Sequence, residues 1–155
     1  MGQEVGMDAR EGIERLLYAY SDTIDRGDFV ATGRLFAPEG LYGRAGSSAA
    51  ACGPEQVTGA LAGNVRLYDG VPRTRHCVSN VVIDVDPDGE AAQVQSYVHV
   101  HHQPPGLPLI TIACGTYRDR VHIVDGEWRF AERRMHIELV GDMSTHLVRS
   151  TFRND

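Results

Sequence analysis

The stretch LITIACGTYRDRVHIVDGEWRFAERRMHIELV, residues 109–140, indicates the fold more clearly than any other part of the sequence. Two long segments, 109–124 and 128–140, flank the dipeptide Asp125-Gly126. Asp-Gly favours the type I′ turn, whose twist matches that of two paired antiparallel strands. The sequence therefore predicts a long β-hairpin here.

A second hairpin is expected just before this one. Apolar residues alternate over residues 81–85 and again over 92–100, and the turn sequence Asp86-Pro87-Asp88-Gly89 lies between them. Alternation with a period of two, bounded by turn residues, is typical of half-buried strands. Strand patterns begin at about Arg75, and Pro104-Pro105-Gly106 separates the two hairpins.

Helical patterns come before the strands. Asp8 and Glu11 have the spacing of a capping box, and apolar residues then recur at helical spacing, which predicts a helix over residues 8–26. Gly27 is expected to end this helix.

Two further helices are expected. The first runs from Asp28 through Phe36 and ends at Pro38 and Gly40, and the next begins at Pro54, a residue that suits the first helical turn. Residues 41–42 are predicted as a short strand and residues 43–53 as a loop. Three helices followed by antiparallel strands give an α+β fold, in which a curved sheet packs its concave face on the helices.

Length and charge narrow the function classes. The chain of 155 residues has the size of one domain, 1–155, with 42% hydrophobic and 23% charged residues. A net charge of -6, without any basic run, makes nucleic acid and anionic membranes poor partners. The three cysteines are odd in number and form no Cys-x-x-Cys pair, which favours the cytoplasm. No segment approaches the roughly 18 apolar residues of a membrane span, and no secretory signal is recognisable.

Several short motifs, taken together, resemble the SnoaL-like branch of the NTF2-like superfamily. They are Tyr20–Asp28 leading into Leu35–Pro38, Arg75-His76 followed by Asn80, residues 125–130, and residues 140–147. The resemblance covers nearly the whole chain. It implies an α+β cone, whose curved antiparallel sheet packs on three N-terminal helices and encloses a cavity, and a homodimer or homotrimer.

Within that branch the sequence looks most like scytalone dehydratase, the bile-acid dehydratases and the hexachlorocyclohexane dehydrochlorinase. These share an aspartate near the end of the first helix and a histidine that opens the first long strand, and Asp25 and His76 occupy those positions. The resemblance implies that His76 is the general base and that Asp25 fixes its tautomer. Ile24 stands where scytalone dehydratase has a tyrosine, so the resemblance does not extend to a strictly scytalone-like reaction.

The chemistry of these residue types fits that role. Imidazole is the side chain best suited to take a proton near neutral pH, and a carboxylate on its other nitrogen stabilises the imidazolium as it forms. Together with this chemistry, the resemblance implies a cofactor-free, metal-free lyase or isomerase, acting on an apolar cyclic, polyketide-like or steroid-like small molecule. Read alone, Asp25 could be a solvated helix-end acid and His76 an ordinary strand histidine.

Four other residues are candidates for substrate binding: Tyr42, Tyr20, His99 and His101. The tyrosines could donate hydroxyl hydrogens to a substrate oxygen, although Tyr20 fits core packing equally well. His99 and His101 share one face of a strand and could orient a substrate or, with a third ligand, hold zinc or iron; otherwise they face solvent. Five polar residues near the C-terminus could reach the cavity mouth or a subunit interface, but surface charges are the preferred interpretation: Arg133, Arg134, Glu138, Asp142 and His146.

Two other function classes remain open. The fold is also compatible with a non-catalytic small-molecule-binding or assembly module, because a fold does not determine a function. A metal-dependent oxygenase or hydrolase would use His99 and His101.

Overall fold

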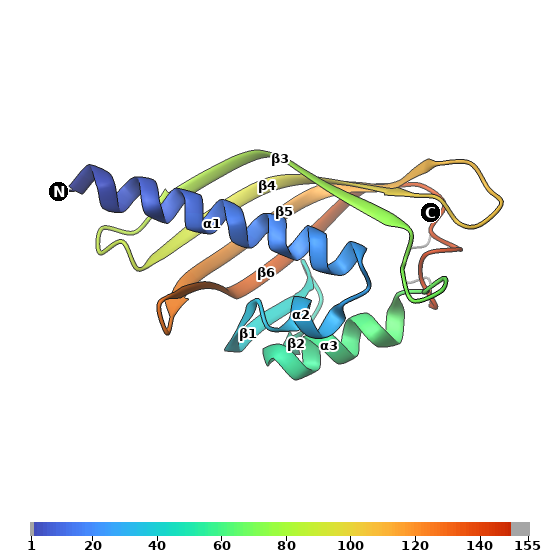
Figure 1. Ribbon diagram of the computed structural model, residues 1–155, viewed down its shortest axis with the longest axis horizontal. Coiled ribbons are helices and arrows are strands. Elements are labelled where there is room, and N and C mark those ends of the chain that lie inside the picture. Colours follow the sequence, from blue (N-terminus) through green and yellow to red (C-terminus); the bar gives the residue numbers. More distant parts are fainter. Residues whose placement is uncertain (1, 150–155) are drawn as a thin grey trace.

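A curved six-stranded sheet with one long helix across its concave side makes up most of the molecule (Figure 1). The computed structural model describes residues 2–149, with side chains from residue 9 onward. The helices are α1 (Gly2–Asp25), α2 (Phe29–Gly33) and α3 (Gly53–Asn64), and the strands are β1 (Phe36–Arg44), β2 (Ala51–Cys52), β3 (Thr74–Val85), β4 (Ala91–His102), β5 (Ile110–Val124) and β6 (Glu127–Val140). The strand order is β2-β1-β6-β5-β4-β3. The predicted α+β fold is confirmed.

Both predicted hairpins are present. Strands β3 and β4 pair from Thr74↔His102 to Val85↔Ala92, and β5 and β6 pair as far as Val124↔Glu127 at the turn. Asp125 and Gly126 have φ angles of 50° and 80°, the two positive values that a type I′ turn requires.

The first helix is longer than its sequence pattern indicates. It begins at Gly2, so Asp8 lies inside the helix and is not its N-cap, contrary to the capping-box interpretation. Its end agrees closely with the prediction. Asp28 N–H bonds to Thr23 O at 3.0 Å and Gly27 N–H bonds to Ile24 O at 3.0 Å, the paired bonds of a Schellman motif.

The second helix is shorter than expected. It ends at Gly33, and Phe36 instead begins β1, which pairs with β6 in parallel, so the sheet is mixed and not purely antiparallel. The ladder between β1 and β6 is interrupted between Phe36 and Leu41, and Pro38, which has no N–H to contribute, lies in that interruption. The proline therefore marks an irregular strand, not the end of a helix. The predicted loop 43–53 also contains the end of β1 and all of β2.

The core forms where α1 meets the inner face of the sheet. Ile13, Leu17 and Tyr20 of α1 are buried, together with inward residues of the strands such as Val98 and Phe130. Helices α2 and α3 lie beside β1 and β2 (Figure 1). No helix within residues 2–149 is both long and apolar enough to cross a membrane.

Candidate functional site

The end of α1 places Asp25 at the inner face of β3. Gly27, with a φ of 75°, lets the chain turn directly after the helix, and a Cβ there would lie 2.4 Å from Gly70 O. Only glycine combines this left-handed conformation with such a close approach. Asp25 is consequently the last residue of a helix whose end is fixed.

Asp25 and His76 form a buried hydrogen-bonded pair. His76 Nδ1 lies 2.6 Å from Asp25 Oδ1, and the side chains of His76 and Asp25 are 8% and 5% exposed. The His76 backbone N–H donates to Oδ2 at 2.8 Å, and the Thr74 hydroxyl donates to Oδ1 at 2.8 Å. Because a carboxylate only accepts, Nδ1 carries a proton, and in the neutral form of His76 the lone pair lies on Nε2.

The surroundings of Asp25 keep its carboxyl ionised. Burial raises its pKa, but the hydrogen bonds and charge of His76, with the hydroxyl of Thr74, outweigh burial and lower the pKa below its usual value. The pair therefore has the charge arrangement of a general base with its orienting carboxylate.

His76 lines a cavity of about 200 Å³ between α1, α3 and the inner face of the sheet. Its wall is mainly apolar, with contributions from Ile24, Leu61, Val100, Met135, Ile137 and Met143. A cavity of about 150 Å³ can hold benzene. The enclosed space therefore suits a molecule of one or two rings.

Tyr20 and Tyr42 form one polar part of this wall. Their hydroxyls lie 3.1 Å apart, and both residues line the cavity. Burial raises the pKa of Tyr20 well above its usual value, and burial also raises the pKa of Tyr42 although Tyr20 and Arg133 oppose it. Both phenols are neutral near pH 7, so they can donate hydrogen bonds.

Arg133, interpreted from the sequence as a surface charge, is fully buried next to these tyrosines. Its Nε and Nη2 atoms donate to the two Asp119 oxygens at 2.9 and 2.8 Å, and neither side chain is exposed. Its guanidinium lies over the rings of Tyr117, Tyr20 and Phe130, at 3.9, 4.2 and 4.3 Å from their centroids. The surface interpretation is wrong, because β6 points this residue inward.

His146 is also buried, again contrary to the surface interpretation. Its side chain lines the cavity beside Met143 and Leu147, and its ring centroid is 5.7 Å from that of His102. His102 has both ring nitrogens bonded, to Arg73 O at 3.0 Å and to the Thr145 hydroxyl at 3.1 Å. Sequence reasoning did not select His146 as a component of the site, and His102 packs beside it without lining the cavity.

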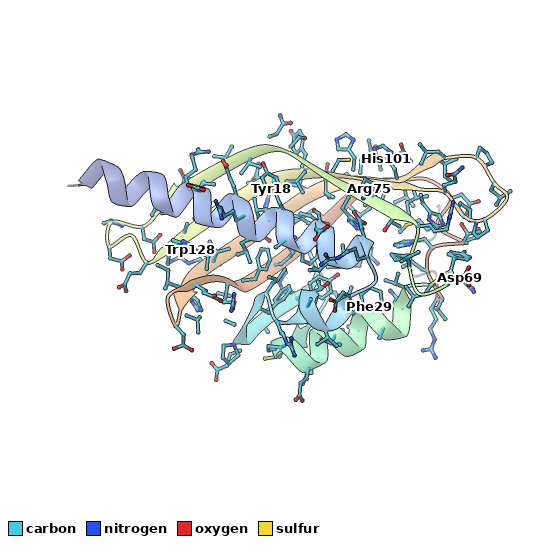
Figure 2. The ribbon with its side chains drawn as sticks, viewed as in Figure 1. Tyr18, Phe29, Asp69, Arg75, His101 and Trp128 are labelled. Atoms are coloured by element: carbon cyan, nitrogen blue, oxygen red, sulfur yellow. The ribbon has the colours of Figure 1, made fainter. Side chains whose placement is uncertain are left out.

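His99 and His101 lie on the opposite face of the sheet from the cavity. They alternate with the buried Val98 and Val100, and Figure 2 shows His101 on the outer side, away from α1. His101 Nδ1 is 3.0 Å from the Thr111 hydroxyl, and His99 Nδ1 is 3.8 Å from Cys114 Sγ. The prediction that they contact a substrate does not hold for this cavity. Within residues 2–149 no cluster of three or more side chains of metal-binding type is found.

The burial of His146 predicts a specific pH dependence of stability. Burial, with His76 and His102 nearby, lowers the pKa of His146 to about 4. An unfolded chain protonates a histidine near pH 6.5, so between pH 6.5 and 4 the unfolded state binds more protons and stability falls as the pH falls. Protonation of His146 should lower the free energy of unfolding by about 3 kcal/mol between pH 6.5 and pH 4.

Urea unfolding of the wild type and His146→Gln between pH 4 and 7 measures this loss. The variant should show a shallower slope, whereas His99→Gln, on the outer face, should keep the wild-type slope. Equal slopes in wild type and His146→Gln would contradict the expectation. The lowered pKa of Asp25 places its own contribution at lower pH, outside this window.

Comparison with known proteins agrees with this architecture. A model of the SnoaL-like domain matches residues 6–134. A proposed scytalone dehydratase from Novosphingobium aromaticivorans DSM 12444 is 26% identical, with a TM-score of 0.75 over 90% of this chain and 91% of that one. No curated protein matches the chain significantly.

Two further solved structures from Novosphingobium aromaticivorans share the fold. An NTF2-like protein with a cystatin-like fold is 19% identical, with a TM-score of 0.76 over 93% of this chain and 90% of that one. The beta subunit of a proposed aromatic-ring-hydroxylating dioxygenase is 18% identical, with a TM-score of 0.71 over 88% and 94% of the two chains. Because the domain model covers most of the sequence and the fold agrees, the chain belongs to the SnoaL-like family of NTF2-like proteins.

Proposed function

We propose that this protein is a cofactor-free lyase or isomerase in which His76 is the general base and Asp25 its positioning carboxylate. The observation that carries the proposal is the 2.6 Å contact between His76 Nδ1 and Asp25 Oδ1, at the wall of a mainly apolar cavity. The contact directs the lone pair of Nε2 away from the carboxylate. A proton-accepting atom and an apolar enclosure are together what carbon-acid chemistry requires.

The reaction follows from these groups. His76 Nε2 takes a proton from a carbon next to a carbonyl, the electron pair moves into an enolate, and Asp25 stabilises the imidazolium. The enolate then either expels a leaving group, which takes the proton back from His76 as it departs, or is reprotonated at another carbon. The Tyr42 hydroxyl, which accepts a hydrogen bond from Tyr20, has its own hydrogen free to donate to the oxygen that gains charge.

The size of the cavity narrows the substrate class. A volume of about 200 Å³ favours a cyclic ketone or enone with one or two rings inside the cavity. The likeness to a proposed scytalone dehydratase, at 26% identity, supports dehydration as the first reaction to assay.

The direct test uses a panel of one- and two-ring β-hydroxy ketones and enones in D₂O. We expect the protein to accelerate deuterium exchange at the acidic carbon, or loss of water, for at least one compound that binds. If compounds bind in the cavity but none exchanges or eliminates, the catalytic proposal fails and the binding-module alternative is favoured.

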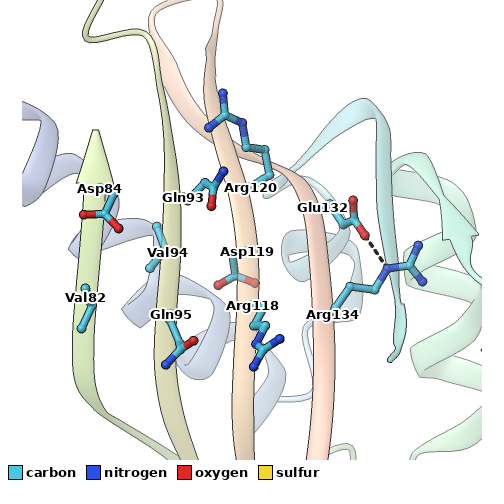
Figure 3. A pocket seen from close by; sticks show the side chains of 10 residues that line it. All are labelled: Val82, Asp84, Gln93, Val94, Gln95, Arg118, Asp119, Arg120, Glu132 and Arg134. Atoms are coloured by element: carbon cyan, nitrogen blue, oxygen red, sulfur yellow. Dashed lines mark hydrogen bonds and ion pairs between the residues drawn. The ribbon is translucent and has the colours of Figure 1, made fainter. Parts of the chain in front are cut away.

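We also propose a homo-oligomer, a dimer or a trimer, formed through the outer face of the sheet. This face carries the exposed apolar residues Val82, Tyr97 and Leu139. Figure 3 shows the residues that line a hollow on the same face, where Arg134 pairs with Glu132, and β4 lies between the arginines of β5 and Asp84 of β3. Such a mixture of apolar and oppositely charged groups can pair with a second copy of itself.

Analytical ultracentrifugation tests the assembly. The wild type should sediment as an oligomer, and Leu139→Glu should shift the mass toward the monomer. Val30→Glu, at an exposed apolar residue of α2 away from the sheet face, is the control and should keep the wild-type mass. A monomeric wild type would refute the assembly and leave the catalytic proposal untouched.

A further inference from the structure

His146 is a buried imidazole that the proposed proton transfer does not use. It is 8% exposed and lines the cavity that also contains His76. Its Nδ1 atom is sealed from solvent and has no hydrogen-bond partner within the described part of the chain. Buried polar atoms in native proteins are nearly always bonded, so the missing protein partners of this ring distinguish it from an ordinary structural histidine.

The backbone around His146 is held on both sides. His146 N–H bonds to Met143 O at 3.0 Å, and Arg66 N–H bonds to His146 O at 2.8 Å. Val148 N–H also bonds to Asn64 O at 2.7 Å, which ties this segment to the end of α3. The ring is therefore placed by its backbone and not by hydrogen bonds of its own.

The neighbouring His102 shows the contrast. Both of its ring nitrogens are bonded to protein atoms, which is the pattern of a structural histidine. His146 has neither ring nitrogen bonded to protein among residues 2–149, although it is almost as deeply buried. The segment after β6 thus holds in the cavity an imidazole whose ring nitrogens have no partner among residues 2–149.

The burial of Nδ1 determines the tautomer of His146. Near neutral pH this ring carries one proton, because burial holds its pKa at about 4. The tautomer with its lone pair on the sealed Nδ1 avoids burying an N–H that has no acceptor among the described residues. In that tautomer the proton lies on Nε2, which is then the donor available to a ligand.

We infer that His146 Nε2–H binds an oxygen atom of the ligand, from a different part of the cavity wall than the Tyr20–Tyr42 pair. Tyr20 packs among Phe36, Phe130 and Tyr117, whereas His146 belongs to the segment after β6 and packs against His102. A ring that meets both groups carries two oxygen functions. The ligand class is therefore a cyclic or aryl hydroxy ketone, with His146 as a specificity-determining residue.

This inference rests on the proposed function only in taking the cavity as the binding site. Its probes are 4-hydroxyacetophenone and acetophenone, two one-ring ketones that differ by a single oxygen. Calorimetric titration of the wild type should show the hydroxy ketone binding about 3–10-fold more tightly, the effect of one added hydrogen bond.

His146→Leu should abolish this preference and change the affinity for acetophenone little. His146→Gln keeps an N–H donor and should retain part of the preference for the hydroxy ketone. A preference lost in His146→Leu but partly kept in His146→Gln would therefore come from the missing donor and not from a general packing defect. Circular dichroism checks that each variant is folded. The inference is overturned if His146→Leu keeps the wild-type preference for the hydroxy ketone, or if the wild type binds neither ketone. The preference is measured by binding without turnover, so failure of the catalytic proposal alone would leave this result standing.

Discussion

Arg133→Met should lower the free energy of unfolding by about 3–5 kcal/mol, since removing one partner leaves the other charge buried and uncompensated. Arg133 and Asp119 are joined by two hydrogen bonds of 2.9 and 2.8 Å in a place that solvent does not reach. Burial raises the pKa of Asp119 even with Arg133 beside it. Without the guanidinium the carboxyl must lose its charge or draw in water, and each response costs free energy.

Urea unfolding at pH 7, with two companion variants, measures this cost. The double variant Arg133→Met with Asp119→Leu removes both charges and should recover most of the lost stability, because apolar replacements of a buried pair are often neutral or stabilising. Arg134 is the neighbouring arginine, and it forms a partly exposed ion pair with Glu132. Arg134→Met should lower the free energy of unfolding by less than about 1 kcal/mol. If Arg133→Met cost no more than Arg134→Met, the buried pair would not stabilise the fold.

The consequences of this variant should extend to the cavity. The guanidinium lies over Tyr20 and Tyr117, and both tyrosines line the cavity. The Nη1 atom of Arg133 is buried and has no hydrogen-bond partner among the described residues. The guanidinium is therefore held by its bonds to Asp119 and by its contacts with the aromatic rings. Arg133 therefore supports the tyrosine wall from behind.

The strands of this fold could be predicted from the sequence because each hairpin has a local cause. Asp125-Gly126 favours one turn type, and alternation over residues 81–100 separates an inner from an outer face. The region of β1 has no such local cause. Phe36 becomes a strand residue by pairing with Phe130, which lies 94 positions later in the sequence, and a local pattern cannot anticipate that.

The site was predictable in part for the same reason. Asp25 and His76 were placed by motif, and the structure brings them into contact. Arg133 was missed because its charge favours a surface position, although it continues the alternation of Met135 and Ile137, both of which line the cavity. That alternation was the signal available. For His146, burial depends on the tail folding back onto the end of α3, through the bridge Val65↔Leu147, and no local pattern indicates it.

His76→Gln should lower kcat/KM by about 10²–10⁴-fold on whichever substrate the exchange assay identifies, the usual contribution of a general base. Glutamine keeps the approximate size of the side chain but cannot take a proton at neutral pH. Asp25→Asn should cause a loss of about the same order, because an amide can donate to Nδ1 and so favours the wrong tautomer of His76. The measurement is steady-state kinetics at pH 7 with ligand binding followed in parallel, and binding should change far less than turnover.

The double variant distinguishes a catalytic pair from two independent contributions. If Asp25 acts only through His76, then Asp25→Asn added to His76→Gln should cost little more than His76→Gln alone, because groups that act as a unit are strongly non-additive. Thr74→Val is the matched control, since it removes one 2.8 Å hydrogen bond to Asp25 but keeps the 2.6 Å contact with His76. Its expected loss is about 3–10-fold, the scale of a single hydrogen bond. Multiplicative losses in the double variant would mean that Asp25 has a role of its own, and the proposed mechanism would have to give it one.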